Sequence, residues 1–333
     1  MKRVLRFLPD TFTLLLLATV TLGSFLPCQG KAAEIFDHLT TFAIALLFFL
    51  HGAKLSREAI VAGITHWKLH LVIFFGTFVL FPIAGFLMRP LGPLLLTNDL
   101  MMGLLFLCAL PSTVQSSIAF TSIAGGNVPA AICSASASNL FGVFLTPLIV
   151  TILMKATGEG LSFLHAVQGI VLQILVPFVA GQIARRWIGA WVQRHRIVVR
   201  FVDQGSILMV VYGAFSEAVV NGLWQQIPLV SLLWLFVVSA VLLAVIMILL
   251  WVLTGIMGFT RPDRITIVFC GSKKSLASGV PIANVLFPAA LVGPMVLPLM
   301  VFHQIQLMVC ATLARRWGAW SAREEKKNLP ATH

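Results

Sequence analysis

Two polar, helix-breaking stretches interrupt long apolar segments of this chain, about half a chain apart. The first begins at Pro111 and continues to Asn139, and the second runs from Gly271 to Asn284. Hydrocarbon can neither hydrogen-bond a broken backbone nor solvate a lysine, so such stretches persist only inside protein or beside a water-filled cavity. Interrupted segments in matching positions of two halves are typical of secondary transporters, whose substrate site lies between them. The sequence therefore predicts a membrane transporter.

The composition supports a chain embedded in a membrane. Of the 333 residues, 59% are hydrophobic and only 10% are charged, whereas soluble proteins average about 25% charged residues. We therefore predict an all-α integral membrane protein with a single transmembrane domain over residues 1–333. The net charge of +12 would suggest nucleic-acid binding in a soluble domain, but the basic residues fall between apolar segments, where they set topology. We expect membrane lipids, and no nucleic acid, as partners.

Hydropathy predicts ten membrane spans, since a helix needs about 20 apolar residues to cross the hydrocarbon core. The expected ranges are 9–27, 35–53, 67–88, 98–123, 127–154, 161–186, 205–223, 228–257, 263–289 and 291–315. Residues 1–30 also imitate a signal peptide. Pro9 and Asp10 interrupt its usual pattern and the cleavage site is poor, so a first transmembrane helix is favoured.

The distribution of Lys and Arg predicts the orientation. With a cytoplasmic N-terminus, the inner connections carry 18 of the 23 basic residues and the outer ones carry three, while Lys273 and Lys274 lie inside a span. We therefore expect a protein of the inner membrane with both termini in the cytoplasm. This orientation requires an even number of spans. Basic stretches recur near residues 185–200 and 315–327. We therefore expect two inverted five-helix repeats, at about 9–154 and 161–315, and a cytoplasmic tail at 316–333.

The first polar stretch offers neutral oxygens for a small cation. Pro111 removes a backbone donor and frees carbonyl groups, and hydroxyl side chains follow it directly. Helix packing is the alternative, because small residues let membrane helices approach closely. The predicted ion-binding residues are Thr113, Gln115, Ser116, Ser117, Ser134, Ser138 and Asn139.

The second polar stretch carries two adjacent lysines deep in an apolar segment. A lysine at this depth costs at least ~2.5 kcal/mol unless it finds a partner or water. The alternative is that the lysines reach the interface or form a structural ion pair. Glu217 is the only acid well inside an apolar segment, and we hypothesise that it neutralises one lysine. The predicted substrate or coupling residues are Lys273, Lys274, Ser275, Ser278, Asn284 and Glu217.

Other chemistry has little support in the sequence. There is no phosphate-binding loop, no zinc motif, no nucleophile elbow and no carboxylate pair within the membrane. We expect no enzyme, no cofactor and no metal other than sodium. His303, with Gln304 and Gln306, is in a position to line a cavity.

The sequences from Leu110 to Val128 and from Gly271 to Val285 resemble those of the bile acid:sodium symporter family, and the resemblance covers nearly the whole chain. It implies ten helices in a panel and a core domain, with the fourth and ninth helices broken and crossing near ion sites. Substrate would bind in a cavity behind the crossing.

The same resemblance marks a departure from the family pattern. Ser116 and Ser117 lie where the family has a Ser-Asn pair that binds sodium, and Ser134 and Ser138 match the hydroxyl ligands of the next helix. In the ninth helix, Phe269 and Lys273 replace a glutamate and a glutamine. Since an ammonium and a sodium ion within ~4 Å repel by several kcal/mol at an effective dielectric near 20, Lys273 would then replace sodium and favour proton-coupled or uncoupled transport.

Two functions follow from these features. The first is a secondary active transporter, coupled to sodium or protons, that moves a small organic anion across the cytoplasmic membrane by alternating access. The second is a non-transporting membrane regulator of ion homeostasis built on a transporter scaffold. An intramembrane enzyme ranks below both, because no histidine or acid lies at a matching spacing from the serines.

Overall fold

The computed structural model describes residues 11–54, 66–155 and 171–328, and every regular element in these ranges is helical. The elements are α1 (Thr11–Phe25), α2 (Lys31–Lys54), α4 (Trp67–Phe75), η2 (Gly76–Leu80), α5 (Phe81–Met88), η3 (Arg89–Leu91), α6 (Gly92–Leu95), α7 (Asn98–Ala109), α8 (Gln115–Ala124), α9 (Val128–Lys155), η4 (Val171–Leu175), α11 (Val176–Arg194), α12 (Arg196–Val220), α13 (Leu223–Gln226), α14 (Leu229–Ile256), α15 (Arg261–Gly271), α16 (Leu276–Leu286) and α17 (Ala289–Asn328). The prediction of an all-α protein is confirmed for these residues.

Within the described residues, six helical segments are long and apolar enough to cross a membrane. They are Lys31–Lys54, Trp67–Leu91, Val128–Met154, Ile197–Val220, Leu229–Ile256 and Ala289–Trp320. They correspond to six of the ten predicted spans, and the shorter apolar helices Leu14–Phe25 and Asn98–Ala109 coincide with two more. The predicted sixth span begins outside the described residues. The total of ten spans and the two repeats stay predictions. Helix α17 continues through most of the predicted tail.

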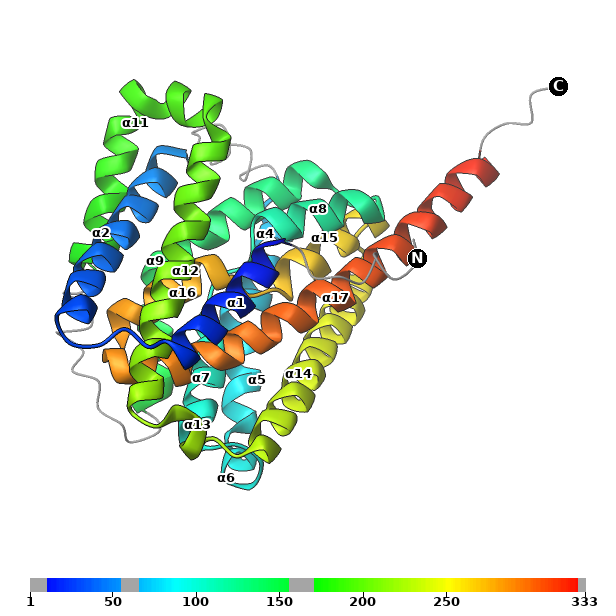
Figure 1. The fold of residues 1–333 in the computed structure, drawn as a ribbon. Helices are drawn as coiled ribbons and strands as arrows, with labels where there is room; N and C mark the ends of the chain where they lie inside the picture. Colours follow the sequence, from blue (N-terminus) through cyan, green and yellow to red (C-terminus); the bar gives the residue numbers. More distant parts are fainter. Residues whose placement is uncertain (1–10, 55–65, 156–170, 329–333) are drawn as a thin grey trace, which may run out of the picture.

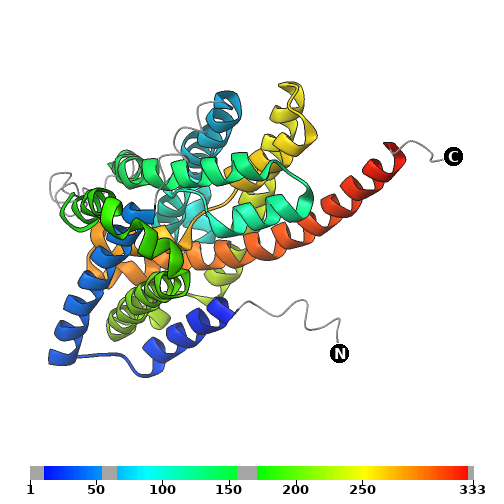
Figure 2. The ribbon, with the colours of Figure 1, turned by 90° about the horizontal axis from the view of Figure 1, so that it is seen from above.

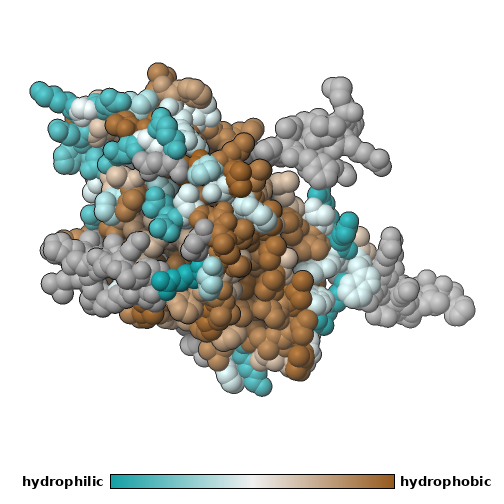
Figure 3. All heavy atoms as spheres, turned by 90° about the horizontal axis from the view of Figure 1, so that it is seen from below, coloured by the Kyte–Doolittle hydropathy of each residue, from teal (hydrophilic) through white to brown (hydrophobic). Residues whose placement is uncertain are grey.

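The outer surface is apolar where a membrane would contact it. Helix α14, for example, exposes Leu233, Phe236 and Ile248 and has almost no polar side chain. Figure 3 shows apolar residues covering the centre of one face, with hydrophilic residues gathered at its margins. Apolar side chains at these positions lose no free energy in hydrocarbon, so the exterior agrees with the composition.

The helices pack as two groups that meet along α12. Helix α2 lies against α11, and α1 lies against α12 (Figure 1). Helix α17 crosses most of the molecule and contacts α7, α8, α14 and α16 as well as α12 (Figure 2). The first group consists of α1, α2, α11 and α12, and the second consists of α4 to α9 and α14 to α17.

Two predicted spans are each divided into a pair of short helices. The segment predicted at 98–123 breaks between α7 and α8, at residues 110–114, and the segment predicted at 263–289 breaks between α15 and α16, at residues 272–275. The first break contains Pro111, and the second directly follows Gly271. The prediction of two broken helices is confirmed.

Two glycines bring α2 and α11 close together. A Cβ atom at Gly52 would clash with the carbonyl oxygen of Phe178, and one at Gly181 would clash with the carbonyl oxygen of Phe49. Both obstacles are backbone atoms, which cannot rotate away as a side chain would. Small residues of this kind allow close backbone approach between membrane helices.

We expect Gly181→Ala to lower the free energy of unfolding by about 1–3 kcal/mol, because it overpacks this contact. The matched control is Gly205→Ala in α12, where a Cβ atom meets nothing within 4 Å. That variant should keep or raise the thermal unfolding midpoint in detergent micelles, since alanine favours helix over glycine by about 0.5–1 kcal/mol. Equal midpoints for the two variants would contradict the close approach.

Candidate functional site

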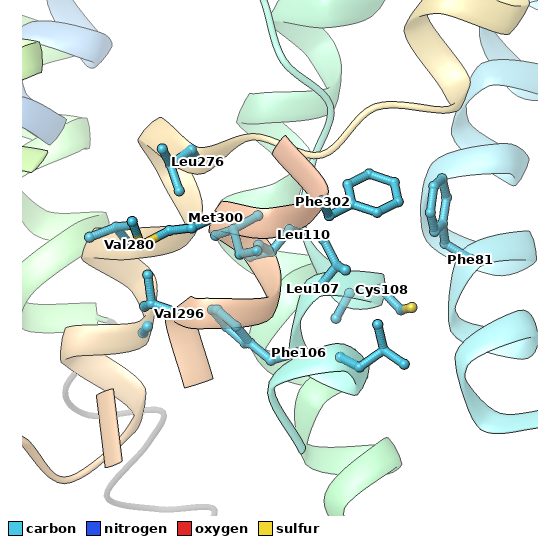
Figure 4. Close-up of a cluster of buried hydrophobic side chains, with 14 of the residues drawn as sticks. Phe81, Phe106, Leu107, Cys108, Leu110, Leu276, Val280, Val296, Met300 and Phe302 are labelled. Atoms are coloured by element: carbon cyan, nitrogen blue, oxygen red, sulfur yellow. The ribbon is translucent and has the colours of Figure 1, made fainter. Parts of the chain in front are cut away.

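The two helix breaks contact each other directly. The Ser275 N–H donates to the carbonyl oxygen of Pro111 at 2.9 Å, which joins one break to the other. The hydroxyl of Ser112 donates to the Cys270 carbonyl oxygen at 2.5 Å. Apolar side chains that flank the two breaks, among them Leu110, Leu276 and Phe302, belong to one buried hydrophobic cluster (Figure 4). The crossing is therefore a polar contact with hydrophobic core beside it.

The first break leaves no main-chain carbonyl oxygen unsatisfied. The five carbonyl oxygens of residues 108–112 would lose their partners where α7 ends. Each accepts a hydrogen bond of 2.7–2.9 Å from outside α7. The donors, in order, are Lys274 Nζ, Thr146 Oγ1, Lys274 Nζ again, the Ser275 N–H and Asn139 Nδ2. The break is thus held by groups from α9 and from the second break.

Lys274 is fully buried and extends its ammonium into this region. Its Nζ donates to the carbonyl oxygens of Cys108 at 2.8 Å, Leu110 at 2.7 Å and Thr77 at 2.8 Å. The face of the Phe81 ring lies 4.2 Å from Nζ. The lysine joins the second break to the first and to η2.

The backbone of Lys274 is fixed by one buried amide. The Lys274 N–H donates to Gln306 Oε1 at 2.9 Å, and Gln306 Nε2 donates to the Lys274 carbonyl oxygen at 2.9 Å. This amide satisfies both main-chain groups of a residue outside any helix. Gln306 was expected beside a cavity, and instead it anchors the break and is 0% exposed.

Lys273 is equally buried but has different surroundings. Its Nζ has no hydrogen-bond partner among the described residues. It lies 4.2 Å from the centre of the Phe120 ring and 5.4 Å from that of Phe269, which are distances for cation–π contacts. The two adjacent lysines therefore point to unlike environments.

Most of the predicted ion-binding side chains lie together beside the crossing. Thr113 Oγ1 is 2.9 Å from Ser117 Oγ and accepts from Ser116 Oγ at 2.8 Å. Ser117 Oγ also donates to the Phe269 carbonyl oxygen at 3.2 Å. These three hydroxyls form a cluster at the start of α8.

A second polar group links α9 to α16. Asn139 Oδ1 accepts from Ser278 Oγ at 2.6 Å, and the Ser278 hydroxyl is 3.2 Å from that of Ser275. Ser138 Oγ accepts from the Ser112 N–H at 3.0 Å. The predicted residues Ser138, Asn139, Ser275 and Ser278 thus act together in holding the crossing.

Three predicted residues lie elsewhere. Ser134 is one turn from Ser138, where its hydroxyl is 2.6 Å from His70 Nδ1 of α4. Asn284 is half-buried further along α16. Glu217 is exposed on α12, whereas both lysines are fully buried, and no salt bridge joins Glu217 to either lysine within the described residues. The hypothesis that Glu217 neutralises a lysine is wrong. The lysines find carbonyl oxygens and aromatic rings instead.

A cavity of about 350 Å³ lies beside the crossing. Its polar wall comes from the starts of α8 and α16, from α9 and from α17, and it includes six predicted residues. The described lining residues with polar side chains on this wall are Thr113, Gln115, Ser116, Ser136, Asn139, Ser275, Ser278 and His303. The expectation that His303 lines a cavity is confirmed.

The opposite wall carries charges that the sequence did not reveal. His51 and Lys54 from α2 and Arg200 and Asp203 from α12 line the cavity, and His51 Nε2 lies 3.6 Å from Asp203 Oδ1. In the sequence these residues lie at or just outside the ends of the predicted spans 35–53 and 205–223, where charged groups usually set topology or meet the interface. Only the packing of α2 against α12, and of α12 against α16 and α17, turns them toward a cavity. No local sequence signal distinguishes them.

Known proteins resemble this chain over nearly its full length. Residues 10–319 match the SBF-like CPA transporter family. The chain is 62% identical to an uncharacterized protein of Pseudomonas aeruginosa, over 94% of each chain. It is 58% identical to the Escherichia coli protein named "Putative symporter YfeH", over 92% of each chain. It is also 28% identical to sodium/bile acid cotransporter 7 of Rattus norvegicus, over 85% of this chain and 84% of the relative.

We expect Asn139→Ala to lower the free energy of unfolding by about 1–3 kcal/mol, because it leaves the Ser112 carbonyl oxygen buried without a donor. The matched control is Ser136→Ala, a cavity-lining residue of the same helix for which no hydrogen bond is recorded. Its effect should stay within about 0.5 kcal/mol. Thermal unfolding in micelles compares the two, and equal losses would contradict the role given to Asn139.

Proposed function

The chain belongs to the SBF-like CPA transporter family, and from that membership we propose that it is a secondary transporter of small organic anions across the cytoplasmic membrane. Membership of this family also agrees with the relatives named symporter and cotransporter, and it makes the chain a multi-pass membrane transport protein and not an enzyme. The substrate class, the coupling and the mechanism are the proposed parts.

The observation that carries the proposal is that two half-helices begin at the same cavity. Val114, Gln115 and Ser116 at the start of α8 and Leu276 and Ala277 at the start of α16 all line it. The first N–H groups of a helix have no intrahelical partner, and the helix dipole makes that end positive. Helix N-termini are therefore ready-made anion sites, and no side chain caps the start of α8.

The facing wall of the cavity supports the same substrate class. Lys54 and Arg200 bring two positive charges there, against the single carboxylate of Asp203. The remaining lining is largely apolar, with Phe48, Phe178 and Leu307 among its residues. Such a site suits a molecule with an anionic group and an apolar body.

The position of the cavity between two helix groups suggests how it would open to the two sides of the membrane in turn. Its walls come from the two helix groups, with α2, α11 and α12 on one side and α8, α9, α16 and α17 on the other. We propose that the first group is the panel domain and the second the core domain of a ten-span protein with cytoplasmic termini. Rocking of one against the other would expose the half-helix ends to each side of the membrane in turn.

Coupling to sodium or protons completes the proposal. The hydroxyls of Thr113, Ser116 and Ser117 offer neutral oxygens to a sodium ion, and the His51–Asp203 pair offers a place for a proton. Both sets line or adjoin the cavity. An ion bound at either one would change the field felt by an anion in the cavity.

Uptake into proteoliposomes tests this function. The probes are straight-chain carboxylates, aromatic carboxylates and a bile acid, first screened by their effect on the thermal unfolding midpoint and then followed as labelled compounds. Arg200→Ala and Lys54→Ala should each reduce uptake of the best probe by about 10-fold or more, which is the loss of about 1.4 kcal/mol of binding. Arg194→Ala, which removes an exposed charge of α11 away from the cavity, is the matched control and should keep wild-type uptake.

Two outcomes would contradict the proposal. One is folded protein that neither binds nor transports any of these anions while the cell still depends on the chain, which would favour the membrane regulator. The other is equal loss of uptake in the Arg200→Ala and Arg194→Ala variants, which would place the anion outside this cavity.

A further inference from the structure

Three main-chain carbonyl oxygens converge on one point inside the protein, and each is freed by the local sequence. The carbonyls of Cys108 and Leu110 are released where α7 ends before Pro111. In the π-helix η2 the Phe81 N–H returns to Gly76, so the matching donor for Thr77 would be residue 82. That residue is Pro82, which has no N–H. Pro111 after α7 and Pro82 after η2 thus leave carbonyl oxygens that need an outside donor.

The group at that point is the Lys274 ammonium, 2.7–2.8 Å from all three oxygens. A protonated amine has three N–H donors and no acceptor, whereas a neutral amine has only two donors. Three acceptors at hydrogen-bond distance therefore match the charged form. The negative end of the α7 dipole adds to the attraction, because two of the oxygens belong to its last turn and the residue after it.

Acidic groups do not supply this attraction. Within the described ranges the recorded salt bridge lies between α2 and α12 and not at the crossing. The partners of Nζ are neutral oxygens from unwound backbone and a half-helix C-terminus, with the Phe81 ring at 4.2 Å. In broken-helix transporters, that same set of groups coordinates the transported cations.

We propose that the three carbonyls form a site for a small monovalent cation, and that Lys274 fills it permanently as a tethered cation. The site then needs no metal ion, and the positive charge of the Lys274 ammonium cannot leave it. What this inference says about the coupling ion rests on the proposed transport function. A cation attached to the chain cannot cross the membrane with the substrate, so this site contributes no moving ion to transport.

The inference assigns the role to Lys274, whereas the sequence resemblance suggested Lys273. Lys273 supplies a matched control, since it is the adjacent residue, is also 0% exposed and yet has no hydrogen-bond partner for its Nζ among the described residues. Removing the Lys273 ammonium unpairs no carbonyl, and removing the Lys274 ammonium unpairs three.

The first test replaces each lysine by methionine, which keeps the chain length and removes the donors. Lys274→Met should lower the thermal unfolding midpoint in micelles by roughly 6–12 °C, or prevent folding, because three buried acceptors lose their partner. Lys273→Met should keep or raise the midpoint. A similar loss in both variants, or a larger loss for Lys273→Met, would overturn the proposal.

The second test restores the cation without its tether. In Lys274→Ala, ammonium chloride should raise the unfolding midpoint saturably over choline chloride at constant ionic strength, or recover folded protein where choline gives none. The same titration of Lys273→Ala should show no such rise. Equal responses to ammonium in the two variants would overturn the proposal, as would a Lys274→Ala variant that folds in choline and does not respond.

Neither test requires a known substrate. Failure of the anion-uptake experiments with the predicted lysine results would remove transport and leave the tethered cation intact. Anion uptake together with lysine results that contradict the prediction would remove the tethered cation and leave the transport function intact. The two claims are therefore separable by experiment.

Discussion

The structure depends on the satisfaction of a broken backbone in a place that water cannot reach. Two helices end and restart inside the apolar core, and each end leaves polar main-chain groups that hydrocarbon cannot hydrogen-bond. The solution is reciprocal, because one break supplies donors to the other. The Ser275 N–H and the Lys274 ammonium serve the first break, and the Ser112 and Ser117 hydroxyls serve the second. The crossing would not exist with either break alone.

This arrangement also accounts for the cavity. Once α8 and α16 restart at the crossing, their positive ends both line the cavity. No side chain caps α8, and the small hydroxyl of Ser275 caps α16. Helices α2, α11 and α12 then close the far wall with Lys54 and Arg200. The carbonyl-bearing end of α7 faces the Lys274 ammonium, and the N–H-bearing ends of α8 and α16 face the cavity. The same two breaks therefore separate the sites for opposite charges. A fixed cation lies on one side of the crossing, and the cavity on the other side has space for an anion.

Several of these features could be predicted from the sequence because they depend on local chemistry. Pro111 and Gly271 locate the breaks, and hydropathy locates the long helices. The features that depend on three-dimensional packing could not be predicted. The partners of Lys274 include the carbonyl of Thr77 in η2, which lacks a main-chain donor because Pro82 lies five residues after it. The acid Glu217 was chosen as a partner on depth alone, yet it faces outward. Likewise His51 and Asp203 look like span-end residues until α2 and α12 are packed.

The most direct measurement is an experimental structure of the wild-type protein determined in sodium chloride and, separately, in sodium-free choline chloride. Our account predicts the same density in both, with Lys274 Nζ within hydrogen-bond distance of the carbonyl oxygens of Thr77, Cys108 and Leu110. A bound ion among those three oxygens, with the Lys274 side chain turned away in either condition, would contradict it.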